Sequence, residues 1–413
     1  MGYQQGLSGL AGASNALDVI GNNIANANTV GFKSSTAQFA DMYANSVATS
    51  VNTQIGIGTA LNSVEQNFGQ GTINTTSSSL DVAINGNGFF QMSNNGVTTY
   101  SRDGTFQRDK SGFIVDSQGR NLMGYAAGPG GVINTAQTVP LQAPTNNIAP
   151  TVTTKITGQF NLNSQDTVPT KTPFDPNDTT TSNYSTSIQV YDSLGGSQAV
   201  NIYFAKSAAG TWEAYAGVQG GATTDLGTVT FNSSGAIQST TTGTPPTPTT
   251  SVGQFQFTVP NTDGSATPQS LTLDLTGTTQ YGGKDGVNNL VQDGFASGTL
   301  TTYTIGTDGK LTGNYSNGKS AVLGQIALAN FNNPNGLVNL GGNQYAESAA
   351  SGVPQVSAPG STNHGTLQGS ALENSNVDLT SQLVNLITAQ RNYQANAQTI
   401  KTQQTVDQTL INL

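Results

Sequence analysis

Cysteine is absent from the 413 residues of this chain, and histidine occurs only once. A chain without cysteine forms no disulfide, has no thiol nucleophile and builds no cysteine-ligated zinc site. The single histidine, His364, lies in a Gly/Ser/Asn-rich segment with no carboxylate beside it in the sequence. A Ser-His-Asp triad needs a histidine that an acid orients towards a nucleophile. We therefore expect a solvated His364, and no catalytic, cofactor-binding or metal-binding residues.

Charge is also scarce, at 8% of residues, and the net charge is −9. An acidic chain without a basic run is a poor partner for nucleic acid. No stretch approaches the ~18 apolar residues of a membrane-spanning helix, so we expect no membrane insertion. Residues 1–17 lack the basic start and the apolar run of a cleaved secretory signal. That criterion by itself predicts a cytosolic protein, unless export uses another route.

Glycine, by contrast, is abundant, with 50 residues, and serine, threonine and asparagine fill the interior of the chain. This composition suits short strands joined by tight turns and disfavours a helical or doubly wound α/β protein. The length allows two to four domains. Residues 240–251 contain three prolines among threonines and are expected to form a low-complexity loop.

Apolar stripes mark both ends of the chain. Near the C-terminus the stripe comprises Leu379, Leu383, Leu386, Tyr393, Ile400 and Leu410, and near the N-terminus Leu10, Leu17, Ile20 and Ile24. Most members recur at seven-residue spacing, which is typical of coiled-coil strands. We expect an N-terminal helix over 4–27 to pair with a C-terminal helix over 371–413. The alternative is two ordinary surface helices of a globular core. Gly6, Gly9 and Gly12 weaken the first helix by about 1 kcal/mol each.

The order of these patterns predicts a nested, multi-domain and mainly β fold. Two β-rich domains, one inserted in the other, accompany paired terminal helices that form a coiled-coil-like domain. The expected boundaries are 1–30 with 370–413 for the helical domain, 31–79 for an irregular or extended connector, 80–147 with 291–369 for the first β domain, and 148–290 for the inserted outer β domain.

The scattered carboxylates offer a weak alternative in a different class. A glycosidase needs two carboxylates in a defined arrangement, and Asp81, Asp103, Glu213 and Asp274 are candidates that no motif singles out. A secreted β-rich binding protein or enzyme with incidental helical tails would predict activity in the middle of the chain and a monomer that stays monomeric.

Two stretches carry a resemblance to a known family. The first contains Asn22, Asn23, Asn26, Gly31, Phe32 and Lys33, and the second contains Asn376, Asp378, Gln390, Arg391 and Tyr393. They resemble the N-terminal and C-terminal signatures of bacterial flagellar rod and hook proteins. The length and the large insert are similar to the hook members of this family. A distal rod or hook-filament junction protein is the alternative within it. In the first signature, Gly31 permits a sharp exit from the helix.

The resemblance implies a structural subunit. Such subunits form a helical homopolymer, a curved hollow tube that acts as a universal joint between rod and filament and transmits motor torque. Its implied partners are copies of itself, a flagellar rod protein, a hook cap protein, a hook-filament junction protein and the flagellar type III export apparatus. Export would use an uncleaved N-terminal signal and place the protein outside the cell, at the basal body and hook.

The physical properties of the terminal helices agree with this implication. Weak helices should be disordered in the monomer and should fold when neighbouring subunits bury their apolar stripes. Their polar faces are rich in Gln, Asn and Thr, with few charges. We expect these faces to line the channel of the tube, where a neutral hydrophilic wall would not retain a transiting unfolded chain.

Overall fold

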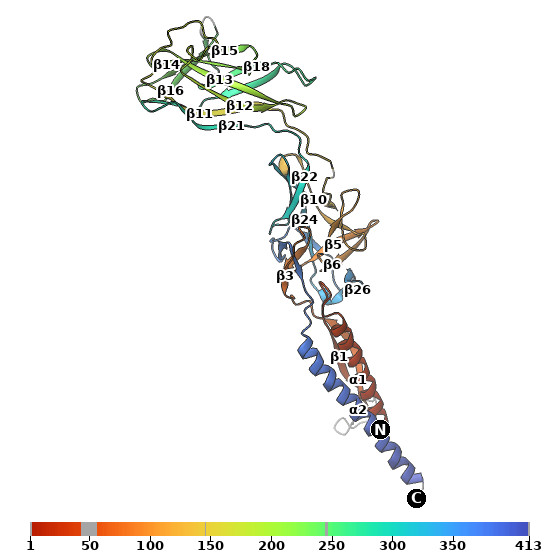
Figure 1. Cartoon of the computed structure of the whole chain (residues 1–413). Helices are drawn as coiled ribbons and strands as arrows, with labels where there is room; N and C mark the ends of the chain where they lie inside the picture. Colours follow the sequence, from red (N-terminus) through yellow and green to blue (C-terminus); the bar gives the residue numbers. More distant parts are fainter. Residues whose placement is uncertain (1, 43–55, 145, 244–246, 412–413) are drawn as a thin grey trace. The chain divides into compact units, whose positions relative to one another are not determined.

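The computed structural model describes residues 2–42, 56–144, 146–243 and 247–411. It is mainly β, with an α-helix near each end of the chain (Figure 1). The chain divides into two compact units, which are residues 1–145, 301–314 and 320–413, and residues 146–300 and 315–319. Within the described residues, no helix is long and apolar enough to cross a membrane.

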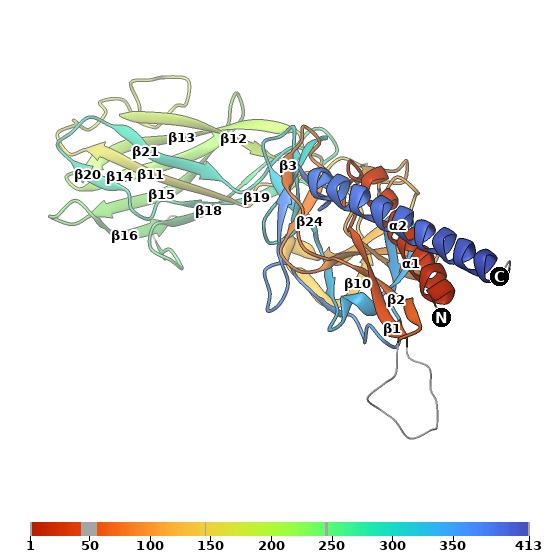
Figure 2. The same ribbon diagram turned by 90° about the horizontal axis from the view of Figure 1, so that it is seen from below.

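The two terminal helices are α1 (Gly2–Ala25) and α2 (Leu379–Ile411). They lie side by side within the first unit (Figures 1 and 2). This arrangement confirms the predicted pairing of the chain ends. The chain leaves α1 through Gly31, whose φ of 68° lies in the left-handed region, as the sequence predicted.

A β-hairpin follows α1, where the sequence predicted an irregular connector. Strands β1 (Ser35–Met42) and β2 (Gly58–Gln66) pair antiparallel, with Ser35 opposite Gln66 and Met42 opposite Gly58. Both strands are largely exposed along their length. The sequence signal was weak because a strand with little buried surface needs no clean apolar alternation.

The first unit contains a 13-stranded sheet that joins early and late parts of the chain. Strand β5 (Phe89–Asn94) pairs with β25 (Leu328–Asn330), and β9 (Asn121–Ala127) pairs with β24 (Ser320–Ile326). The main path runs through β22 (Leu300–Ile305), β23 (Lys310–Tyr315), β24 (Ser320–Ile326), β9 (Asn121–Ala127), β5 (Phe89–Asn94), β6 (Val97–Ser101), β27 (Gln344–Ala346) and β26 (Val338–Gly341), with β7 (Gln107–Arg108), β8 (Ile114–Val115), β10 (Ile133–Pro140), β25 (Leu328–Asn330) and β28 (Gln355–Ser357) attached.

Two small two-stranded sheets also pair an early strand with a late strand of the chain. Strand β4 (Val82–Asn85) pairs with β29 (Thr366–Gly369), and β3 (Ile73–Thr75) pairs with β30 (Ala371–Glu373). Strand β30 thus ends shortly before α2 begins at Leu379, and its partner strand lies about 300 residues earlier in the chain. The buried core of the unit includes Ile84, Phe90 and Leu328.

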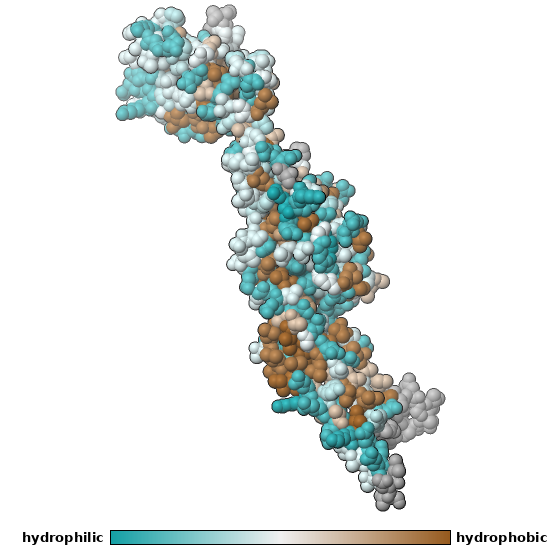
Figure 3. Space-filling view, turned by 45° about the vertical axis from the view of Figure 1, so that its right-hand side comes forward, coloured by the Kyte–Doolittle hydropathy of each residue, from teal (hydrophilic) through white to brown (hydrophobic). Residues whose placement is uncertain are grey.

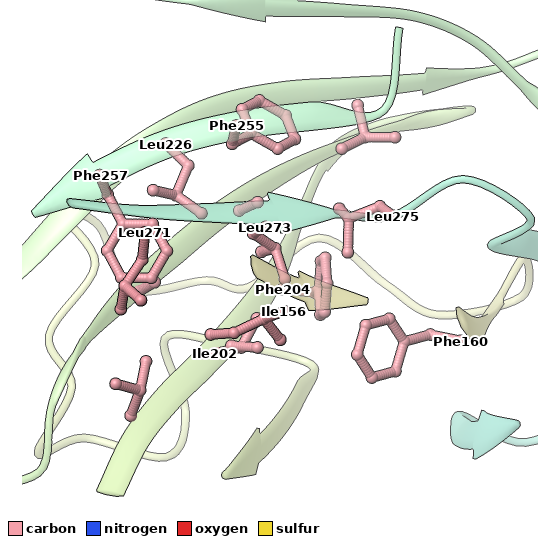
Figure 4. Close-up of a cluster of buried hydrophobic side chains, with 14 of the residues drawn as sticks. Ile156, Phe160, Ile202, Phe204, Leu226, Phe255, Phe257, Leu271, Leu273 and Leu275 are labelled. Atoms are coloured by element: carbon pink, nitrogen blue, oxygen red, sulfur yellow. The ribbon is translucent and has the colours of Figure 1, made fainter. Parts of the chain in front are cut away.

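The second unit contains two sheets around one core (Figure 4). One sheet has the order β12 (Tyr184–Tyr191), β13 (Ser197–Ala208), β14 (Thr211–Val218), β15 (Thr223–Phe231), β16 (Ile237–Thr242) and β17 (Thr247–Pro248). The other contains β18 (Gln254–Val259), β19 (Gln269–Asp274), β11 (Lys155–Asn163), β20 (Thr279–Tyr281) and β21 (Gly286–Gln292). Trp212 is fully buried between them. Strands β16 and β17 occupy parts of 240–251, predicted as a loop, and residues 244–246 of that loop lie outside the described residues.

Candidate assembly interface

Two glycines of α1 set its distance from α2. A Cβ atom added to Gly9 would lie 2.7 Å from Asn396 Oδ1, and one added to Gly6 would lie 2.9 Å from Ile400 Cγ1. The side chains of α2 therefore fill space that any larger residue of α1 would occupy. Gly12 faces the hairpin instead, where an added Cβ would lie 3.3 Å from Thr59 Cγ2. The glycines cost helix propensity, but they permit the close packing that holds the helix in place.

The contacts also fix the direction of the pair. Gly6 lies at Ile400, and near the other end of α1 the Asn23 amide lies 3.5 Å from Gln382 Oε1. The helices are therefore antiparallel. Ala389, at 6% exposure, is the most buried described residue of α2.

The residues predicted to form the stripes fall into two groups. Leu10, Leu17, Ile20, Ile24, Leu386 and Ile400 are partly buried. Leu379, Leu383, Tyr393 and Leu410 are exposed, at 43%, 49%, 39% and 65%. The assignment of both stripes to contacts between subunits stays a prediction, and within one chain α1 covers only part of the C-terminal stripe. On a helix with 3.6 residues per turn, Leu379 and Leu383 lie about 80° and 120° around the axis from the buried Ala389, so both lie away from α1.

The exposed part of the stripe forms an apolar face on α2. Leu379 and Leu383 are joined there by Val384 and Ile387, which are 59% and 51% exposed and were missed by the seven-residue spacing. Figure 3 shows apolar residues gathered on the terminal helical region of the first unit. Contiguous exposed apolar surface on a protein commonly marks a contact with another molecule. Gln390 and Arg391, the polar signature residues of α2, are exposed as well.

A buried ionic cluster attaches the helices to the β region. Lys33 Nζ lies 2.7 Å from Glu373 Oε1, and Arg102 Nη1 lies 3.2 Å from Glu373 Oε2. Lys33 also donates to the Gly69 carbonyl, and Arg102 to the Gly86 carbonyl. Burial lowers the pKa of both cations, and the carboxylate of Glu373 opposes both shifts. Removing that carboxylate would leave two buried positive charges without a counter-ion.

Two signature asparagines connect the helix ends to the hairpin. The Ser34 amide donates to Asn376 Oδ1 at 2.8 Å, and Asn376 Nδ2 donates to the Asn67 carbonyl at 2.7 Å. Asn23 Oδ1 accepts from the Ser35 amide at 2.9 Å, and its Nδ2 donates to the Ser35 carbonyl at 2.8 Å. Each asparagine side chain thus hydrogen-bonds to backbone amide and carbonyl groups that have no backbone partner at these positions.

The remaining residues of the N-terminal signature shape the turn after α1. Asn26 donates to the carbonyl and the side chain of Asn22. Gly31 donates its N–H to the Glu373 carbonyl at 2.8 Å, and a Cβ at Gly31 would lie 2.7 Å from the Asp103 nitrogen. Only glycine fits this left-handed position against another backbone segment. Phe32, which follows it, is partly buried.

Asp378 caps the N-terminus of α2. Its Oδ1 accepts the Thr380 amide at 2.9 Å, and its Oδ2 accepts the Ser381 hydroxyl at 2.8 Å. The hydrogen bonds from Ser381 and Thr380 lower the pKa of Asp378. A charged aspartate at this position satisfies free backbone amides of the first helical turn.

The four carboxylates weighed as catalytic candidates have structural partners. They accept hydrogen bonds as follows: Asp81 from Thr76, Asp103 from the Thr105 amide, Glu213 from Tyr215, and Asp274 from Gln254, with Lys155 as its ion pair. His364 is partly buried rather than solvated, with its ring nitrogens 2.9 Å from the Thr362 and Gln355 carbonyls. The described ranges contain no group of three His, Cys, Asp or Glu residues suited to a metal ion.

Sequence models of four flagellar families match the chain. They are described as flagella basal body rod protein at residues 4–33, flagellar hook protein FlgE/F/G D1 domain at 83–159, flagellar basal body protein FlaE D2 domain at 161–295, and flagellar basal body rod FlgEFG protein C-terminal at 368–413. Together they extend over both helices and both units.

The full-length relatives reported below share one description, flagellar hook protein FlgE. The flagellar hook protein FlgE of Salmonella typhimurium (strain LT2) is 42% identical over 424 residues and that of Escherichia coli (strain K12) is 39% identical over 422, each alignment covering 100% of both chains. The Treponema pallidum protein of the same name is 32% identical, covering 99% of this chain and 98% of its own. The crystal structure of Helicobacter pylori flagellar hook protein FlgE2 shares the fold, with a TM-score of 0.50 and 15% identity, covering 73% of this chain and 100% of that one.

Proposed function

The chain belongs to the flagellar hook protein family, and we propose that it polymerises through its terminal helices into the curved hollow tube of the hook. It is a structural subunit of the flagellar hook. In this role the polymer is a universal joint that carries motor torque from the rod to the filament.

The exposed apolar face of α2 is the observation that carries the polymerisation. Leu379, Leu383, Val384 and Ile387 are each at least 43% exposed. At about 25 cal/mol per Å², covering such side chains stabilises an assembly appreciably. The Lys33–Glu373 pair supports the same proposal because it anchors the helices to the β region. A subunit anchored in this way can transmit force from its inner helices to its outer domains.

The polar faces of the helices are proposed to line the channel. Gln390 and Gln404 are exposed on α2, and the helix carries only three charged residues, namely Arg391, Lys401 and Asp407. A neutral hydrophilic wall neither repels nor retains an unfolded chain that passes through it. The proposed layout places residues 1–30 and 370–413 innermost and the domain over 148–290 outermost.

The proposed partners follow from a position between rod and filament. They are a rod protein at one end, the cap protein under which subunits add, a hook-filament junction protein at the other end, and the flagellar type III export apparatus. Export through this apparatus with an uncleaved N-terminal signal would place the protein outside the cell. We also propose that the chain has no enzymatic activity, since the weighed carboxylates serve structural contacts.

Immunogold electron microscopy of isolated flagella tests the function. An antibody against residues 150–285 is expected to label only the short curved segment next to the rod. Label on the straight rod would reassign the chain to the distal rod, and label confined to the base of the filament would indicate a junction protein. A chain that is absent from flagella and monomeric in the medium would favour a secreted binding protein or enzyme.

A further inference from the structure

The C-terminal end of α2 extends beyond α1. Gly6 lies at Ile400 and Gly9 at Asn396, and α1 begins at Gly2. In this antiparallel register the first residue of α1 lies opposite about residue 404 of α2. Helix α2 continues to Ile411, and its end runs past the start of α1 in two views (Figures 1 and 2). Residues 404–411, here named the overhang, therefore have no part of α1 beside them.

The overhang carries apolar side chains on the side that packs against α1 elsewhere. Asn396, Gln403 and Leu410 recur at seven-residue spacing, which keeps them on one side of a helix. Asn396 contacts α1 and Gln403 is partly buried, whereas Leu410 is 65% exposed. Val406, one turn before Leu410, is 46% exposed. The contact surface of α2 thus continues past the point where its partner in the same chain ends.

A groove of matching chemistry lies further along the helix pair. It has a volume of about 450 Å³ between α1, α2 and the hairpin, and its lining includes Phe39 and no charged residue. Its small residues are Gly9, Gly12, Ala13, Ala16, Ala389 and Ala395. The alanine side chains leave room in the groove for branched side chains such as Val and Leu, whereas Asn396 of the same chain fills the space beside Gly9. Groove and overhang therefore fit in size and in the absence of charge.

We propose that the overhang of one copy of this chain docks in this groove of a second copy, with Val406 and Leu410 inserted among the small residues. The occupant is a second copy because Leu410 lies 21 residues from Ala389, about 31 Å along one rigid helix. The groove also presents glycine and alanine positions of α1, the kind of surface that α2 already contacts within the chain. The inference rests on the proposed function and names the contact that propagates the polymer.

The symmetry of this contact suits an open polymer. The overhang and the groove are different surfaces of the same chain, so the contact is heterologous. Heterologous contacts generate a closed ring or an open helical array, and the open array leaves one surface free at each end. A hollow helical tube is an array of this type.

Paired cysteines test the contact, because the natural chain contains none. Leu410→Cys and Ala16→Cys are introduced together into the full chain, in cells where the variant replaces the native gene, and isolated hooks are oxidised. An intrachain disulfide would require Cα atoms within about 7 Å, which the distance along the helix forbids. We expect a ladder of covalent dimers, trimers and longer species on a non-reducing gel. The pair Leu410→Cys with Val338→Cys, which places the second thiol on exposed β26, is the matched control.

Each outcome decides the proposal. A ladder at least about tenfold stronger than in the control pair supports the contact, and equal yields from the two pairs in assembled hooks overturn it. If the double variant does not assemble, the two single variants are co-expressed. The contact then predicts covalent dimers and no longer species, and their absence overturns it. Failure of the unmodified chain to form hooks would instead contradict the proposed function.

Discussion

Lys33 and Glu373 lie 340 residues apart in the chain, and their side chains form a 2.7 Å ion pair in which neither is exposed to solvent. Lys33 follows α1 within the N-terminal signature, and Glu373 ends β30 shortly before α2. One ionic contact therefore ties both terminal helices to the β region. The family signature at the N-terminus serves a junction within the subunit, whereas the apolar face of α2 remains free for neighbours.

Glu373→Gln is expected to destabilise the first unit by about 3–5 kcal/mol, because it leaves Lys33 and Arg102 as buried unpaired cations. Hydrogen exchange at the Gly31 and Ser34 amides would report the loss. The only tryptophan, Trp212, lies in the second unit, so the denaturant midpoint of its fluorescence should stay unchanged.

Asp308→Asn is the matched control for this prediction. It breaks the exposed pair with Lys310, whose side chain is 44% exposed, and exposed pairs contribute little to stability. Equal exchange rates in the Glu373→Gln and Asp308→Asn variants would contradict a stabilising role for the buried cluster.

Gly9→Leu is expected to separate the terminal helices. Even a Cβ at this position lies 2.7 Å from Asn396 Oδ1, and a leucine side chain needs more space than Asn396 can release by turning. Hook assembly should fall strongly, and exchange of the α1 amides should rise in any polymer that forms.

Gly21→Leu tests whether that effect comes from packing. Nothing lies within 4 Å of a Cβ at Gly21, and replacing glycine in an exposed helix stabilises it by about 0.5–1 kcal/mol. This variant should assemble normally. Loss of assembly in both variants would mean that α1 needs its glycines for flexibility instead.

Lys155→Met should make the second unit more sensitive to acid. Burial raises the pKa of Asp274, but hydrogen bonds from Lys155 and Thr276 outweigh it and hold the pKa at about 2. A carboxyl whose pKa is depressed by folding contributes stability that is present above its ordinary pKa of about 4 and is lost as the pH falls towards 2. The contribution is at most about 2 kcal/mol, since the Lys155 side chain is 47% exposed and solvent screens the pair.

Trp212 fluorescence during acid titration measures this effect. The unfolding midpoint of the Lys155→Met variant is expected at higher pH than that of the unmodified chain, and the two chains should be closest in stability near pH 2. Lys171→Met, which breaks the exposed pair with Asp178, should leave the midpoint in place. A wild-type midpoint in the Lys155 variant would show that Thr276 alone holds Asp274 ionised.

Gln390→Lys combined with Gln404→Lys tests the channel lining. Both side chains are exposed on α2, and the added charges would retain acidic segments of passing subunits. We expect assembled hooks with shorter or slower-growing filaments, measured by fluorescent labelling of new filament. Gln390→Asn with Gln404→Asn keeps the wall neutral and should have no effect. Unchanged filament growth in the lysine variant would place this face away from the channel.

The sequence was sufficient for the class of fold and for the pairing of the chain ends. Composition indicated short strands, and seven-residue spacing indicated helices with one apolar side; both are local properties that the structure confirms. It was not sufficient for the hairpin whose strands are Ser35–Met42 and Gly58–Gln66. Its strands are mostly exposed and packed on one side by α1, so their apolar residues do not alternate clearly.

The sequence also could not say which side of α2 meets α1. Periodicity places Leu379 and Leu386 on one side of the helix, but the shape of α1 decides which residues of α2 meet it. Gly6 and Gly9 allow close approach only where Asn396 and Ile400 fit against them. Leu379 and Leu383 were consequently left outside the pair. The signature asparagines and lysine were recognisable as a motif, whereas their contacts with Glu373 and the hairpin depend on segments brought together by the nested sheets.

By itself, the sequence determined the local periodicities, the turn at Gly31 and the absence of thiol chemistry, because these depend on neighbours in the chain and on composition. Tertiary structure alone decided that Lys33 and Arg102 share the carboxylate of Glu373. It also decided that the C-terminal end of α2 extends about two turns past the start of α1. Both facts depend on the register between segments hundreds of residues apart. Register is set by the combined packing of whole surfaces, and no local pattern records it.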